Sequence, residues 1–432
     1  MKYHPDRVYD VYAVVLKEAR ELWDVTARQG SDEDFKLTFD IFTEVVSKNN
    51  AELIQRAKDL FETLPQKKCY SNKDILRCTA WMQAPYWVGM DVLLDEHGHS
   101  NYSRLLADPR FQYIVERECT LYQKSYIEMN TNRLIRYLSS TYQKYGKKTY
   151  TVSPGLAFAL QHTELRKMPA ELLALPYPCI YLAMPPKTFT IYHEETGTHD
   201  VEGAYLVEDK SVTPRAWKIM LAGSPNENSA SDDDDALYHY TMILEDGKTL
   251  EECIQETVRL ATDGTAVRGT VDGKDVVSGG LAQAQLEIFK SLQAQLMNVF
   301  KYAACVCLYA MHPDAEVEGF IEDPEYRALY NRAMKAKGPK RKKLFKRANE
   351  IKGDVRLRLG GSVTVSREER EAAQAPKRKG TKHSVRTYVQ SHWQHYWKKN
   401  ADGVKERTYK RKEAFWKGAK DLPVTVKQHH LK

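Results

Sequence analysis

The chain has 432 residues, of which 42% are hydrophobic and 28% are charged. This composition excludes a disordered chain, and the length predicts two to three domains. Charge is divided unevenly along the chain. Residues 331–432 hold 30 of the 65 Lys and Arg and 9 of the 58 Asp and Glu, which gives a net charge of +21. The rest of the chain has a net charge of −14. A basic C-terminal quarter predicts a polyanionic partner, with a solvated basic tail as the alternative.

The sequence carries no signal-peptide pattern at its N-terminus, and its longest apolar stretch, 298–311, is interrupted by Lys301. That stretch is too short to cross a bilayer, so we predict a buried helix and no membrane partner. The seven cysteines form no C-x-x-C pair, which indicates a reducing, cytoplasmic location. Cys305 and Cys307 are expected to be small core residues.

Residues 1–148 predict a helical domain, because apolar residues recur at helical spacing through 6–66 and again through 72–145. Within the second stretch, between its two helical segments, lie His97 and His99, beside Asp95 and Glu96. Metal ligation is one interpretation, but the spacing matches no zinc motif. We therefore predict a turn with exposed histidines, and neither metal nor cofactor.

Residues 149–330 predict an α+β domain. Short segments rich in β-branched and aromatic residues, punctuated by Pro and Gly, predict a small and mostly antiparallel sheet near 176–245. The acidic segment 226–235 is expected to be a surface loop within it. Helices are expected at 249–263 and at 281–311, and the second is apolar all round toward its end, which places it in a core.

Residues 331–353 predict a basic helical linker with a Gly-Pro break at 338–339, and 354–432 a basic β-rich domain. In that domain we expect a strand with a bend at Gly360-Gly361, then alternating strands joined by a hairpin turn at 400–403. The fold class expected for the whole chain is α+β and mostly helical.

The C-terminal domain mixes basic and aromatic side chains in a way that suits RNA. Lys and Arg neutralise phosphates, and Trp, Tyr and His rings stack on unpaired bases. One face is expected to carry Arg386, His392, His395, Lys398, Arg407 and Arg411. The candidate nucleic-acid-binding residues are Lys377, Arg378, Lys379, Lys382, His383, Arg386, His392, Trp393, His395, Trp397, Lys398, Arg407, Lys410, Arg411 and Lys417. The alternative for Trp393, Trp397 and Trp416 is that they form the core of a small domain.

A catalytic interpretation rests on His392, His395 and Arg386. Two histidines and a cation could serve a metal-independent ribonuclease as general base, general acid and stabiliser of the phosphorane. Residues 382–399 contain no carboxylate base, and a three-histidine cluster in a basic segment more often binds than catalyses. Phosphate-binding, kinase and serine-hydrolase motifs are missing from the sequence, so an enzyme is not the favoured prediction.

The C-terminal pattern resembles that of a phage- and plasmid-borne protein family. The pattern consists of His383 to Arg386, then His392-Trp393 to Trp397, then Trp416-Lys417-Gly418, preceded by CLYAMHPDAEVEG, a Lys/Arg-rich linker and RLGGSV. The family includes a type V-A anti-CRISPR protein that acts on production of the Cas nuclease. The resemblance covers about 130 residues from 300 onward, and implies action in the cytoplasm of a bacterial or phage-infected host.

Together these patterns predict a mobile-element regulatory protein. Its acidic body would bind a protein or ribosome-associated partner, its basic C-terminal domain would bind RNA or a ribonucleoprotein, and the expression of a defence nuclease would fall. The alternatives are a metal-independent ribonuclease and a pure protein-interaction inhibitor.

Overall fold

The structure is a computed structural model. It describes residues 4–29, 34–63, 73–122, 126–165, 167–193, 196–224, 237–265, 267–278, 283–321, 328–329, 332–333, 335–350, 355–374, 387–389, 391–399, 405–413 and 415–417.

The chain forms two compact units, each assembled from three stretches of sequence. Unit 1 contains Met1–Lys147, Tyr177–Ile243 and Thr257–Gln295, and unit 2 contains Lys148–Pro176, Leu244–Glu256 and Leu296–Lys432. Helices α10 (Leu250–Asp263) and α11 (Gln283–Ala310) have residues in both units. The architecture is α+β and mostly helical, as the sequence predicts. The three consecutive domains and the basic linker expected from the sequence stay a prediction.

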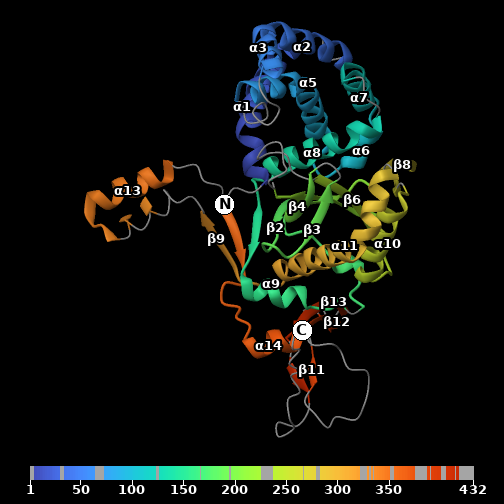
Figure 1. The fold of residues 1–432 in the computed structure, drawn as a ribbon, viewed down its shortest axis with the longest axis vertical. Helices are drawn as coiled ribbons and strands as arrows, with labels where there is room; N and C mark the ends of the chain where they lie inside the picture. The colour runs from blue at the N-terminus through green and yellow to red at the C-terminus, as the bar shows by residue number, and fades with distance from the viewer. Residues whose placement is uncertain are drawn as a thin grey trace. The chain divides into compact units, whose positions relative to one another are not determined.

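Unit 1 begins with a helical bundle (Figure 1). Its helices are α1 (His4–Gln29), α2 (Phe35–Asn49), α3 (Ala51–Thr63), α5 (Lys73–His97), α6 (Tyr102–Ala107), α7 (Pro109–Tyr122) and α8 (Tyr126–Lys144). Aromatic side chains fill the space between them: Trp23 meets Phe42 edge to face, with ring centroids 5.2 Å apart. The side chain of Asp34 accepts hydrogen bonds from the first turn of α2, which explains why that helix begins there.

A sheet completes unit 1, and its strands are β2 (Cys179–Ala183), β3 (Thr190–His193), β4 (Gly197–Asp209), β5 (Arg215–Gly223) and β6 (Leu237–Leu244). The order is β6-β5-β4-β2, with β3 also on β4, and β4 is antiparallel to β2, β3 and β5. Helix α8 packs on β2 and β4, where Tyr142, Tyr181 and Tyr205 meet edge to face. The predicted sheet near 176–245 is confirmed, and the acidic loop 226–235 lies outside the described residues.

A short hairpin of β7 (Val267–Val271) and β8 (Lys274–Ser278) also belongs to unit 1. No strand was expected from the sequence in this segment. Asp272 and Gly273 at its turn both have positive φ, which matches the two-residue Asp-Gly turn typical of hairpins. The dipeptide in the sequence was therefore the signal that could have found it.

The predicted turn is present at residues 99–100 and His97 is partly exposed, but the expected exposure of His99 is wrong. His99 is 5% exposed, and its Nε2 lies 3.2 Å from Asp95 Oδ1. His97 Nε2 lies 2.7 Å from Asp108 Oδ2. Each histidine ring therefore has a carboxylate partner in the helical bundle. The spacing of these residues in the sequence does not reveal that His99 is buried. Within the described residues, no group of three or more His, Cys, Asp or Glu is arranged to hold a metal ion.

Unit 2 is built around strands β1 (Thr149–Val152), β9 (Val317–Ile321) and β10 (Val355–Leu359). Strand β10 pairs in parallel with β1 and antiparallel with β9. Its other elements are α9 (Pro154–Gln161), a 3-10 turn (Ala170–Leu172), α13 (Gly338–Glu350), α14 (Arg367–Gln374), β11 (Thr387–Val389), β12 (His392–Lys399), β13 (Lys405–Lys412) and β14 (Phe415–Lys417). The core contains the buried end of α11, and Cys305 and Cys307 lie within it as predicted.

The predicted β-rich region contains one helix that was not expected, α14. Ser366 and Glu369 form a capping box at its start: Glu369 accepts from the backbone N–H of Ser366 at 2.9 Å, and Ser366 accepts from that of Glu369 at 3.2 Å. The S-x-x-E spacing in the sequence is the known signature of such a helix start. The predicted basic helix in the linker is confirmed in part, because α13 begins at the Gly338-Pro339 break.

Helix α9 approaches the segment after β10 very closely. The Ser153 hydroxyl donates to the carbonyl of Gly360, and the Ser153 N–H donates to Leu359 O at 3.0 Å. Gly155 follows in the first turn of α9, where a Cβ would overlap the Val363 carbonyl. The absence of a side chain at Gly155 therefore permits this contact.

No helix among the described ranges combines the length and apolar character that a membrane span requires.

We expect Gly155→Ala to lower the free energy of unfolding by about 3 kcal/mol, because the new methyl group meets a backbone carbonyl that cannot rotate away. Urea denaturation checks this. The matched control is Gly361→Ala, where the nearest atom to a new Cβ is 3.8 Å away. Equal unfolding midpoints for the two variants would contradict the close contact.

A buried ion cluster in the helical bundle gives a second stability prediction. Glu118 lies 2.5 Å from Arg136 and 3.6 Å from Arg133, and all three side chains are at most 4% exposed. Glu118→Gln removes the negative charge that lies between two buried guanidinium groups, so we expect a loss of about 3 kcal/mol in unfolding free energy. Glu116→Gln, at an exposed position two residues earlier in the same helix, serves as the control in the same thermal or urea melts.

Candidate nucleic-acid interface

The hairpin of β12 and β13 carries most of the described candidate residues. Its strands are antiparallel, with Trp393 opposite Arg411, His395 opposite Tyr409, and Trp397 opposite Arg407. Side chains directly opposite each other on two strands share a face, and successive side chains along one strand point to opposite faces. These six residues therefore lie on one face, which we call the inner face. The other pairs, among them Gln394 with Lys410 and Tyr396 with Thr408, define the outer face.

The inner face packs against the end of α11. Trp393 is fully buried, and its ring meets that of Tyr409 edge to face at 5.6 Å. The His312 ring lies 6.3 Å from Trp393, and the Tyr409 hydroxyl donates to Leu308 O at 3.4 Å. Burial raises the pKa of Tyr409, which keeps this hydroxyl a donor. Trp393 is therefore a core residue, as the alternative interpretation of the tryptophans predicted.

The same core contains a thiol close to the hairpin. Burial raises the pKa of Cys305 to about 12, so its thiol is neutral at physiological pH. A neutral, buried thiol is neither a nucleophile nor a metal ligand. Its place is structural.

Toward the hairpin turn the inner face becomes accessible. The Trp397 side chain is 59% exposed, and the Arg407 guanidinium lies 5.0 Å from the centre of its ring. Arg407 also forms an ion pair with Glu171. Trp397 can therefore stack on a base, whereas the charge of Arg407 is already partly neutralised.

The outer face carries exposed lysines. Lys398, Lys410 and Lys412 are exposed there, around Tyr396, which is 43% exposed. Gln394 is also exposed, and Glu406 opposite Lys398 is the acidic residue of this face. We call Lys398, Lys410, Lys412, Tyr396 and Gln394 the outer lysine face. Tyr396 and Lys412 were not among the predicted residues, although strict two-residue alternation along β12 and β13 would have included them.

The predicted single face of His392, His395, Lys398, Arg407 and Arg411 is not formed. His392 and His395 are three residues apart, an odd spacing that places them on opposite faces of a regular strand. His392 is buried, and its backbone bridges to Glu164, while His395 is half-buried on the inner face. The two histidines therefore do not meet on one phosphate, as a paired general acid and base would require.

Arg411 differs from the other predicted cations. Its side chain is 8% exposed on the inner face, and its Nη1 lies 2.5 Å from Glu413. A guanidinium in this setting fixes the local structure rather than gathering phosphates from solution.

The remaining predicted residues are only partly covered by the structure. Lys417 lies in β14, opposite Thr387 of β11. Outside the described residues are Lys377, Arg378, Lys379, Lys382, His383 and Arg386. The catalytic prediction for Arg386 and the binding prediction for this segment stay predictions.

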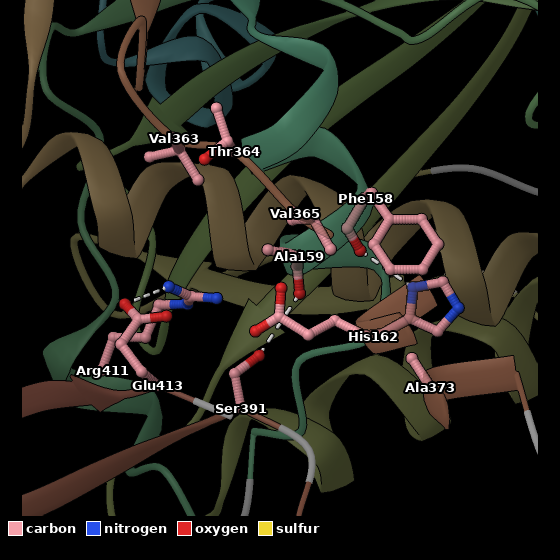
Figure 2. A pocket seen from close by; sticks show the side chains of 11 residues that line it. Phe158, Ala159, His162, Val363, Thr364, Val365, Ala373, Ser391, Arg411 and Glu413 are labelled. Atoms are coloured by element: carbon pink, nitrogen blue, oxygen red, sulfur yellow. Dashed lines mark hydrogen bonds and ion pairs between the residues drawn. The ribbon is translucent and has the colours of Figure 1, made fainter. Parts of the chain in front are cut away.

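A cavity of about 250 Å³ lies at the base of the hairpin, within unit 2. Its walls come from α9, the segment 363–365, α14 and the ends of β12 and β13. The lining residues are Phe158, Ala159, His162, Val363, Thr364, Val365, Glu369, Ala373, Ser391, Arg411 and Glu413. Figure 2 shows the rings of Phe158 and His162 at one side and the Arg411–Glu413 pair at the other. Four separate stretches of the sequence form it, so no single motif pointed to it.

Comparison with known proteins identifies the class. The model of the AcrVA2-like family, the anti-CRISPR type V subtype A2 family, matches residues 150–412. The chain belongs to this family, so the resemblance seen in the sequence is confirmed, and with it an anti-CRISPR role associated with phages.

One solved structure, "Crystal structure of AcrVA2", is similar to this chain at a TM-score of 0.40 and 12% sequence identity. The match covers 79% of this chain and 96% of that one. No curated protein matches the chain.

The two described tryptophans of the hairpin provide a matched test of these environments. We expect Trp393→Ala to lower the free energy of unfolding by about 4 kcal/mol, because it empties a fully buried site. Trp397→Ala should lower it by about 1 kcal/mol or less, since that ring is mostly exposed. Urea denaturation followed by far-UV circular dichroism measures both, and similar losses would contradict the inner-face assignment.

Proposed function

We propose that this anti-CRISPR protein binds single-stranded RNA on its outer lysine face and thereby lowers expression of the nuclease it opposes. The observation that supports this most directly is the arrangement of Lys398, Lys410 and Lys412 around the exposed Tyr396 on one side of the hairpin. Cations spaced along a strand neutralise successive phosphates, and an exposed ring beside them offers a base a stacking surface.

The hairpin suits a single strand better than a duplex. A two-stranded ribbon of eight residues extends for about 26 Å, enough for about four extended nucleotides, and its exposed side is broad rather than groove-shaped. Sequence-tolerant recognition of single strands uses this combination of basic and aromatic side chains. Trp397 lies near the turn, where it can stack on a base that passes the hairpin end.

Helix α13 strengthens the electrostatic attraction. Its exposed side chains include Lys340, Arg341, Lys342, Lys343 and Arg347, and no acidic residue stands in its first turn. Such a helix raises the local concentration of a polyanion without selecting its sequence. We propose that the acidic body, with its net charge of −14 over residues 1–330, binds a protein or ribosome-associated partner in the cytoplasm. RNA on the hairpin and this partner on the acidic body would together bring the chain to a transcript.

Replacing Lys398, Lys410 and Lys412 together by Ala should weaken binding of a 12-nucleotide single-stranded RNA at least tenfold at 0.1 M salt. It should also reduce the slope of log Kd against log salt by about 2. RNA binding releases fewer counterions when three phosphate contacts are lost. Fluorescence anisotropy at several salt concentrations measures both quantities.

The control is an equally charged triple variant of exposed lysines elsewhere, Lys58, Lys210 and Lys274 to Ala. Its salt slope should match that of the wild-type chain. If the two triple variants lose affinity equally, attraction is general and the outer lysine face is not the site. In cells, the outer-face variant should also restore the amount of the opposed nuclease.

A further inference from the structure

The cavity at the base of the hairpin combines a flat aromatic wall with an ionic wall. The Phe158 and His162 rings lie 4.2 Å apart with planes tilted by 33°, and the Arg370 guanidinium lies 5.4 Å from the Phe158 ring centre. The His162 Nδ1 is held by the Phe158 carbonyl at 2.8 Å. Flat groups therefore already gather here in a fixed orientation, and another flat group can extend them.

The opposite wall has a hydrogen-bond donor, Arg411, beside a hydrogen-bond acceptor, Glu413 (Figure 2). Arg411 is held by Glu413, whose own side chain is 77% exposed and so retains oxygen lone pairs toward solvent. The Ser391 hydroxyl lies 2.6 Å from that of Thr163, which fixes this edge of the wall. An arginine donates only, and a carboxylate accepts only, so a ligand must offer an acceptor next to donors.

A phosphate group does not satisfy this wall. Two carboxylates, Glu369 and Glu413, line the cavity, and Arg411 is already paired with one of them. An incoming anion would meet the like charge of both carboxylates, and the one guanidinium among the lining residues is already paired. A neutral, flat heteroaromatic ring avoids that repulsion and still fills the aromatic side.

Among the four RNA bases, guanine matches the ionic wall best. Its O6 accepts, as an arginine requires, and its N1–H and N2 amino group lie side by side as two donors for one carboxylate. Adenine and cytosine offer the carboxylate an amino group alone, and uracil offers a single N–H between two acceptors. The distinction depends on Glu413, because Glu369 already accepts from the Ser366 backbone.

We propose that this cavity receives an unpaired guanine base from the RNA strand that the outer lysine face holds; this inference rests on the proposed function. Arg411 and Lys412 are neighbours in β13 and point to opposite faces of it. A phosphate at Lys412 therefore belongs to a strand that reaches the hairpin base, where the next nucleotide can turn over the edge into the cavity.

The test uses the full chain and 12-nucleotide oligouridine in which one central position is guanine, adenine, cytosine, inosine or abasic. Fluorescence anisotropy should show the guanine oligonucleotide binding on the order of tenfold more tightly than all-uridine RNA. Inosine, which lacks the N2 amino group, should fall between them. Glu413→Gln should reduce the guanine preference to about twofold or less, since an amide presents its own N–H donors to the base.

Glu406→Gln is the matched control, because it removes an exposed carboxylate from the outer face of the same hairpin. The guanine preference should survive in that variant. Phe158→Leu tests the aromatic wall: its affinity for the guanine oligonucleotide should approach that of wild-type protein for the abasic one. Far-UV circular dichroism shows whether each variant is folded.

Three results would overturn the inference in distinguishable ways. Equal affinity for all central bases would rule out the guanine site but would leave the proposed RNA binding standing. No binding of any oligonucleotide at low salt removes the proposed RNA function and the guanine site together. Guanosine monophosphate binding as tightly as the guanine oligonucleotide would assign the cavity to a free nucleotide instead of an RNA strand.

Discussion

The burial of Trp393 is the interaction on which the C-terminal surface depends. A single indole packed against Tyr409 and the end of α11 fixes which side of the β12–β13 hairpin faces the core. Because strand side chains alternate, that one choice sends Lys398, Lys410 and Lys412 outward and turns Arg407 and Arg411 inward. A slip of one residue in either strand would exchange the faces and bury the lysines.

This constraint separates the basic residues of the hairpin into two groups, arginines in ion pairs and exposed lysines. Arg407 and Arg411 are paired with Glu171 and Glu413, so they hold the hairpin in place and shape the cavity beside it. The lysines of the outer face keep their full hydration and exchange it readily for a phosphate. Net charge therefore overstates the exposed and unpaired basic surface, and alternation along the strands identifies the part that remains.

Much of the fold was accessible from local patterns. Helical periodicity predicted the N-terminal bundle and the buried α11, and short β-rich segments predicted the sheet of unit 1. Two elements that were not predicted, α14 and the β7–β8 hairpin, have local signals in the Ser366–Glu369 capping box and the Asp272-Gly273 turn. The error at His99 has a different origin: its exposure depends on how α5 and its neighbours pack, and no pattern within LLDEHGHS reports that.

The sequence by itself determined the family, the mostly helical α+β class and the basic, aromatic character of the C-terminal region, because each is a property of composition, spacing or motif. Only the tertiary structure decided which basic residues are exposed, that His392 and His395 lie on opposite faces, and that Phe158, Glu369 and Glu413 surround one cavity. Cross-strand register and contacts between distant segments fix these features, and both arise from packing that no stretch of the chain encodes alone.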